Sequence, residues 1–118
     1  MEDGRRIGLI GMARYYEDAR TDFVVAVAGP ERAYSEAWVG FLRQCTVEML
    51  GDAMFPEPLI VGGGVLRIGT TSYSHGFGIF QRGECISLSD SVVVWVDANG
   101  RPRAVSEDVK GPLRKNML

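Results

Sequence analysis

Few residues of this chain combine a reactive side chain with a spacing that catalysis or metal binding would use. His75 is the sole histidine, and no serine or cysteine accompanies it in a catalytic-triad pattern, so we interpret it as a strand residue. Cys45 and Cys85 lie far apart and form no CxxC motif, so the sequence predicts no metal site. The glycine run 62–64 has strand-like residues on both sides, which favours close approach of another backbone over a phosphate-binding loop.

The start of the first predicted helix suggests a different chemistry, which uses the backbone. Gly8 and Gly11 lie on either side of Leu9 at this point. The first amides of a helix have no partner within it and carry about half a positive charge in effect. Such amides can stabilise an oxyanion, and glycines leave room for a ligand to reach the backbone. Alternatively, the two glycines only shape a loop.

The element that carries these glycines is predicted from its periodicity. Apolar residues recur at helical spacing over residues 9–28, which predicts one long amphipathic helix. Polar residues fall on the opposite face, and Gly29-Pro30 ends the helix because proline cannot continue the hydrogen-bond ladder. The apolar stripe consists of Met12, Tyr16, Ala19, Phe23 and Val27.

From about residue 37 the apolar period changes to two, which predicts strands. We expect a half-buried strand over 37–49 and further strands over 59–68, 70–81 and 84–96. Glycine-containing turns separate the later strands, and a short helix is expected after Ser106. One helix followed by four strands with short connections indicates an α+β fold, an antiparallel meander wrapped around the helix.

Composition limits the classes of function. A chain of 118 residues that is 46% hydrophobic fits one globular domain over residues 1–118. The net charge of −2 does not favour nucleic acid as a partner. No apolar run reaches the roughly 20 residues that a membrane span needs, and the charged N-terminus does not resemble a signal peptide, so we expect a cytoplasmic protein.

Three segments resemble one known family. Residues 13–20 read Ala-Arg-Tyr-Tyr-Glu-Asp-Ala-Arg, residues 65–72 read Val-Leu-Arg-Ile-Gly-Thr-Thr-Ser, and residues 92–97 precede Gly-Arg-Pro at 100–102. Together they are similar to the hotdog-fold acyl-CoA thioesterases of the 4-hydroxybenzoyl-CoA thioesterase-like group, over nearly the whole chain. The resemblance implies a hotdog fold, in which an antiparallel sheet wraps around one long helix. Aligned on these segments, the sequence begins inside the family's signature loop, so we expect the family's first strand to be missing.

The resemblance also implies a reaction, the hydrolysis of an acyl thioester to free acid and CoA. In the family the thioester carbonyl lies at the helix start, which places Gly8, Leu9 and Gly11 at the substrate. Glu2 falls at the family's catalytic aspartate position, and Asp3, next to it, is the other candidate. However, residues 6–9 read Arg-Ile-Gly-Leu where the family has His-Val-Asn-Asn.

Further site residues follow with less specificity. Glu17 is a third candidate catalytic carboxylate, although it could instead form a surface pair with Thr21 or Arg20. The family's thioester site often includes the region that matches Thr71 and Ser72, where a hydroxyl could bond the pantetheine arm or simply occupy a strand. Arg67 could meet the CoA phosphates.

The resemblance finally implies partners. Acyl-CoA is the expected substrate, no cofactor is expected, and the chain should form a homodimer or homotetramer because the family's site lies between subunits. The altered loop and the missing strand keep an alternative open, a catalytically inactive hotdog domain that binds acyl thioesters or only oligomerises. A hotdog dehydratase ranks low, because His75 lies far from any loop that could pair it with an aspartate.

Overall fold

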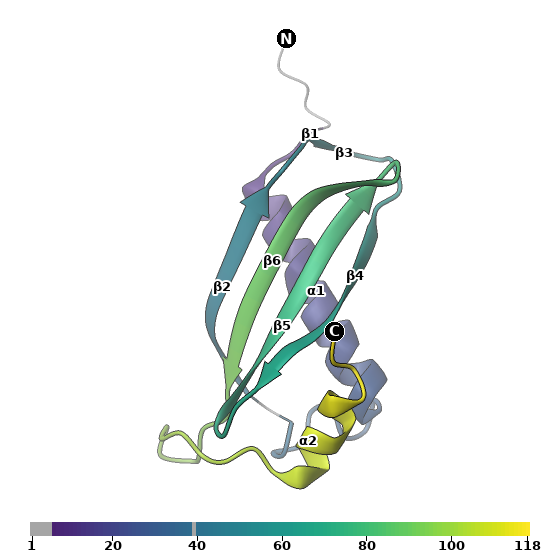
Figure 1. Cartoon of the computed structure of the whole chain (residues 1–118). Coiled ribbons are helices and arrows are strands. Elements are labelled where there is room, and N and C mark those ends of the chain that lie inside the picture. Colours follow the sequence, from purple (N-terminus) through teal and green to yellow (C-terminus); the bar gives the residue numbers. More distant parts are fainter. Residues whose placement is uncertain (1–5, 39) are drawn as a thin grey trace.

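The computed structural model describes residues 6–38 and 40–118 as an antiparallel sheet with one long helix across it and a short helix at one end (Figure 1). The elements in chain order are β1 (Arg6–Ile7), α1 (Leu9–Ala28), β2 (Phe41–Met49), β3 (Ala53–Met54), β4 (Ile60–Ile68), β5 (Ser72–Gln81), β6 (Glu84–Val94) and α2 (Glu107–Arg114). The predicted α+β class, the long helix and the succession of four long strands along the chain are confirmed. The two-residue strands β1 and β3 were not expected.

The four long strands form one sheet in the order β2-β6-β5-β4. Strands β4, β5 and β6 follow one another as hairpins, but β2 pairs with β6, with Phe41 opposite Val94 and Met49 opposite Ser87. The predicted simple meander is therefore wrong for β2. The segment 50–59 is long enough to cross the two intervening strands, which lie about 4.8 Å apart, and its β3 pairs with β1 at that end of the sheet.

Helix α1 packs its predicted apolar stripe against one face of the sheet. Met12 and Tyr16 are buried in one cluster under the N-terminal half of the helix, whereas Phe23 and Val27 pack against a second cluster under the C-terminal half. The sheet contributes Phe77, Ile79 and Ile86 to the first cluster and Val65 and Tyr73 to the second, which Trp95, directly after β6, also joins. The two clusters fix the direction of α1 along the sheet, so its first turn lies at the β1–β3 end.

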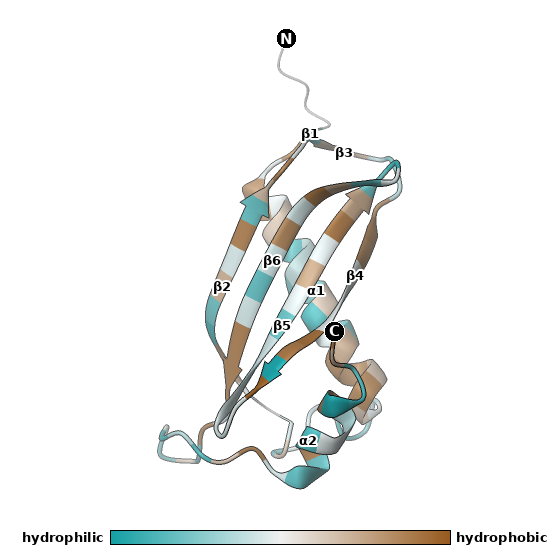
Figure 2. Cartoon of the chain, viewed as in Figure 1, coloured by the Kyte–Doolittle hydropathy of each residue, from teal (hydrophilic) through white to brown (hydrophobic). Residues whose placement is uncertain are grey.

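Strand β2 differs from its prediction in burial. Figure 2 shows hydrophilic and hydrophobic residues alternating along β2, but within the strand only Val47 is even partly buried. The prediction of a half-buried strand is wrong because β2 lies at the edge of the sheet, next to β6 alone. The strand also starts later than predicted, because the preceding residues form turns, with Trp38 N–H donating to the Ser35 carbonyl.

The other edge of the sheet, β4, is partly covered by the end of the chain. Val65 N–H donates to the Asn116 carbonyl over 2.8 Å, and Leu118 N–H donates to the Val65 carbonyl over 2.9 Å. This short parallel pairing follows α2 and fixes it beside β4. Across the residues that the structure describes, no helix is long and apolar enough to cross a membrane.

Candidate functional site

The first turn of α1 presents unpaired backbone amides. Gly8 is the N-cap residue in extended conformation, no side chain caps the turn, and no acidic residue lies in it. The first hydrogen bond of the helix runs from the Met12 N–H to the carbonyl of the N-cap residue Gly8, over 3.0 Å. The amides of residues 9–11 therefore have no partner within the helix, and their partial positive charge is available to an anionic oxygen.

A hollow of about 370 Å³ adjoins this turn. Its lining comes from β1, from one side of α1 and from the segment after β3, and consists of Arg6, Ile7, Gly11, Arg14, Tyr15, Asp18 and Phe55. Arg6 forms an ion pair with Asp52 over 3.5 Å. The hollow therefore combines two guanidinium groups, one carboxylate and an aromatic wall next to open amides.

The two predicted glycines have different surroundings. A Cβ built at Gly11 would lie 2.8 Å from the Ile7 Cγ2 atom, whereas a Cβ at Gly8 would meet nothing within 4 Å. Thus Gly11 makes room for a side chain of the protein itself. Open space for an approaching ligand is found at Gly8.

Of the two described candidate carboxylates, Glu17 and Asp18, only one lines this hollow. Glu2 and Asp3 lie outside the described residues. Glu17 is exposed and does not line this hollow, and its expected link to Thr21 forms through the backbone, since Thr21 Oγ1 donates to the Glu17 carbonyl over 3.2 Å. Asp18 does line the hollow. The sequence analysis left it out, although its spacing of seven from Gly11, with Arg14 and Tyr15 between them, places these residues on one helix face.

The remaining predicted residues lie at the opposite end of the sheet (Figure 1). Arg67, Thr71 and Ser72 belong to the β4–β5 hairpin, whose turn is closed by Gly69 N–H donating to the Ser72 carbonyl over 2.7 Å. Strand β5 runs from this hairpin toward the start of α1 over ten residues, which correspond to roughly 30 Å. One chain therefore does not bring the hairpin residues together with Gly8, Leu9 and Gly11.

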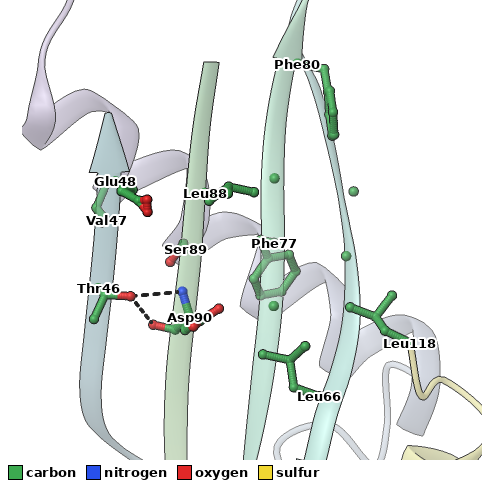
Figure 3. A pocket seen from close by; sticks show the side chains of 14 residues that line it. Thr46, Val47, Glu48, Leu66, Phe77, Phe80, Leu88, Ser89, Asp90 and Leu118 are labelled. Carbon is green, nitrogen blue, oxygen red and sulfur yellow. Dashed lines mark hydrogen bonds between the residues drawn. The ribbon is translucent and has the colours of Figure 1, made fainter. Parts of the chain in front are cut away.

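A larger hollow, about 710 Å³, lies elsewhere, on the sheet face that α1 does not cover (Figure 3). Its wall consists mainly of Leu66, Phe80, Leu88 and Leu118. On its polar side Thr46 Oγ1 accepts from Asp90 N–H over 3.2 Å and donates to the Asp90 carbonyl over 3.4 Å. The whole sheet separates this surface from the open amides of α1.

His75 is on β5, as expected of a strand residue, but its environment was not foreseen. The side chain is fully buried, and neither ring nitrogen has a hydrogen-bond partner among the described residues. The rings of Phe23 and Tyr73 contact it edge-on, with centroids 4.4 and 4.7 Å away. Burial, assisted by the Arg20 charge, lowers the pKa of His75 to about 4, so the imidazole is neutral at pH 7. Within residues 6–38 and 40–118 no three His, Cys, Asp or Glu side chains gather as a metal site would require.

Comparisons with known proteins give a consistent result at the level of fold. No protein-family model and no curated protein sequence matches the chain. Among solved structures, a predicted thioesterase from Bacillus stearothermophilus superposes with a TM-score of 0.86 at 23% identity, over 98% of this chain and 87% of that one. A Thermus thermophilus thioesterase complexed with coenzyme A and Zn gives 0.81 at 18% identity, over 98% and 84%. A gentisyl-coenzyme A thioesterase gives 0.81 at 10% identity, over 96% and 90%.

These likenesses extend over nearly all of the chain and agree with the sheet order and helix placement described above. They match the fold that the helix motif at residues 13–20 predicted. The chain has the hotdog fold of the thioesterase-superfamily structures that it resembles.

Proposed function

We propose that this protein is an acyl-CoA thioesterase, which hydrolyses an acyl thioester to the free acid and CoA. The observation that carries the proposal is the uncapped first turn of α1, which opens beside a hollow lined by Arg14 and Asp18. The superposition on thioesterase structures supports the same reaction, and two of the superposed structures contain coenzyme A.

The reaction needs an oxyanion site and a base. The amides of residues 9–11 stabilise the negative charge that develops on the thioester oxygen. A carboxylate accepts a proton from water, the water oxygen bonds to the carbonyl carbon, and the carbon–sulfur bond then breaks to release the CoA thiolate. Asp18 is the carboxylate that the hollow supplies, and Glu2 and Asp3 remain the candidates that the resemblance supplies.

The substrate's coenzyme A portion carries phosphates, which guanidinium groups bind well. Arg6 and Arg14 supply such groups at the hollow. Arg67, Thr71 and Ser72 lie roughly 30 Å away on the same chain, so they could contribute only from another copy. We therefore include a second copy of the chain in the proposal, with its β4–β5 hairpin at the first copy's α1 start.

The decisive assay follows thiol release from a panel of acyl-CoAs of different chain length and aromatic character. Wild-type protein should turn over at least one of them. Asp18→Asn and the double change Glu2→Ala/Asp3→Ala identify the base, because loss of a catalytic base lowers kcat by about 100-fold or more. Retention of full kcat in both variants would exclude all three carboxylates.

The helix start is tested by giving it a cap. Gly8 has the extended backbone of an N-cap residue and open space at its Cβ position, so Gly8→Asp can direct a carboxylate at the amides of residues 10–11. We expect a gain of a few tenths of a kcal/mol in stability together with a fall in kcat of at least about tenfold. Ser106→Asp makes the equivalent change at the start of α2 and should leave kcat unchanged. A fully active Gly8→Asp variant would refute the oxyanion role.

The alternative is a hotdog domain that binds acyl thioesters without hydrolysing them. The loop residues Arg6-Ile7-Gly8-Leu9 that replace the family's His-Val-Asn-Asn favour it. Saturable binding of acyl-CoA in calorimetry, with no thiol release for any member of the panel, would establish this alternative.

A further inference from the structure

The hollow of about 710 Å³ lies on the outer face of the sheet, which is the face that α1 does not cover (Figure 3). An antiparallel sheet with one solvated face normally points apolar side chains to the core and polar side chains to water. The outer face of β4 and β5 departs from this rule, because residues 60–66 and 76–80 contain no polar or charged side chain. These two strands therefore present an apolar surface to solvent.

The large side chains of this surface are well exposed. Pairing places Ile60 opposite Phe80, and Leu88 opposite Gly78, on the same face of neighbouring strands. At roughly 200 Å² for a fully exposed side chain of this size, the five large apolar residues together present about 500 Å². That area is close to the upper limit of the roughly 300–600 Å² found for the largest apolar patch of a monomer. The five residues have exposed fractions between 37% and 74% and are Ile60, Leu66, Phe80, Leu88 and Leu118.

The same surface has both projections and a recess. A Cβ at Gly76 would lie 3.0 Å from the Leu66 side chain, so Leu66 lies over this glycine. A Cβ at Gly78 would likewise lie 3.1 Å from the Phe80 ring. A Cβ at Gly62 would meet nothing within 4 Å, which leaves this part of the floor open. A patch that carries apolar projections beside an apolar recess can contact a copy of itself, because a two-fold contact uses the same patch on both partners.

The charged residues of the hollow lie on one side of it. Glu48 and Asp90 come from β2 and β6, whereas β4 and β5 contribute no charge to the lining. A two-fold axis along the strands places the β2 side of one copy over the β4 side of the other. The two acidic margins then lie apart from each other and remain at the polar rim that interfaces usually have.

We propose that a second copy of this chain docks on the outer face, so that the two sheets pack face to face around Gly62. Packed sheets lie about 10 Å apart, a distance that interdigitating side chains such as Leu66 and Leu88 fill. With its polar rim, the patch approaches the roughly 800 Å² that each partner buries in a stable interface. The contact leaves the start of α1 free, because the sheet lies between them, and it does not require that the protein hydrolyse thioesters.

The test counts the chains of the assembly by light scattering and sedimentation. Gly62→Glu adds a charge at an open position of the floor and should halve the mass, because an unpaired charge buried in an apolar contact is costly. Gly62→Ala is the matched control, since one methyl group occupies little of the hollow, and it should keep the wild-type mass. If the hairpin of a second copy also contacts the start of α1, the halving is from four chains to two, and otherwise it is from two chains to one.

A second pair of variants maps the face. Leu88→Glu should also halve the mass, whereas Tyr34→Glu, at an exposed aromatic beside the C-terminal half of α1, should keep it. Circular dichroism checks that each variant is folded. A monomeric wild type, or the wild-type mass in both Gly62→Glu and Leu88→Glu, would overturn the proposal. Thiol release is a separate readout, so halving of the mass in a protein that hydrolyses no thioester would refute the proposed function and leave this inference intact.

Discussion

At the scale of single residues, the polar groups buried under α1 fall into two classes. The satisfied groups have a hydrogen-bond partner, and the unsatisfied groups have none among the described residues. The satisfied class is a short relay in which Tyr16 Oη–H donates to Ser87 Oγ over 2.7 Å and Ser87 Oγ–H donates to the Glu48 carbonyl over 2.8 Å. Tyr16→Phe removes one hydrogen bond and should lower the free energy of unfolding by about 1 kcal/mol. Ser87→Ala removes both hydrogen bonds and leaves the buried Tyr16 hydroxyl without its partner, so it should cost about 2 kcal/mol or more. Urea unfolding of the two variants tests this order, and a costlier Tyr16→Phe would contradict it.

His75 represents the unsatisfied class and makes stability depend on pH. Burial lowers the pKa of this imidazole from 6.5 to about 4 in the folded chain, so between these values the unfolded chain binds a proton that the folded chain does not. Stability is therefore complete above pH 6.5 and is lost as the pH falls toward 4. From pH 7.5 to pH 5, wild type should lose about 2 kcal/mol more than His75→Phe. Parallel pH profiles of the two proteins in urea unfolding would contradict the assignment.

The sequence predicted where the long helix starts better than it predicted the surroundings of His75. Gly8 and Leu9 were selected from local spacing and from a motif, both of which lie within one short segment. The environment of His75 depends on Phe23 and Arg20, which belong to a helix far away along the chain. No local pattern marks such an encounter, so a lone histidine is predicted only as a strand residue.

At the scale of elements, two neighbouring glycines of β4 have different surroundings. Gly63 lies close to the backbone of β5, whereas Gly62 faces open space. A Cβ at Gly63 would collide with the Gly76 carbonyl oxygen and would lie 2.6 Å from the Phe77 Cδ1 atom, whereas a Cβ at Gly62 would meet nothing within 4 Å. The predicted backbone approach is thus confirmed at Gly63. Gly63→Ala should cost at least about 2 kcal/mol because β4 must move away from β5. Gly62→Ala should be neutral or stabilising by up to about 0.5 kcal/mol, and thermal unfolding of both variants is the measurement.

The elements themselves were largely predictable, and the exception has a physical reason. The stripe on α1 was correct because helical periodicity is local and one face of the helix packs on the sheet. Strand β2 was assigned as half-buried from its alternation, yet its burial depends on how many neighbours it has. Alternation fixes which side chains share a face but not whether anything covers that face. Edge strands are therefore where this kind of prediction fails.

At the scale of the whole molecule, the arrangement of the two groups of candidate residues bears on assembly. The open amides lie at one end of the sheet and the β4–β5 hairpin lies at the other, so one chain cannot supply both groups to one substrate. Two copies that lie antiparallel about a two-fold axis would have opposite ends side by side and would form two equivalent sites. The proposed activity then requires a dimer, and light scattering should detect one at the concentrations used in the assay.

Mixing two defective copies tests this arrangement directly. Gly8→Asp damages the helix start and Thr71→Val/Ser72→Ala damages the hairpin, so each variant alone should have lost most of its activity. In a mixed dimer one site combines the intact helix start of one copy with the intact hairpin of the other, while the second site carries both defects. Random association makes half of the dimers mixed, so co-expression should restore about a quarter of wild-type kcat. If every site were built within one chain, no such recovery would occur, because each chain would keep its own defect in any pairing.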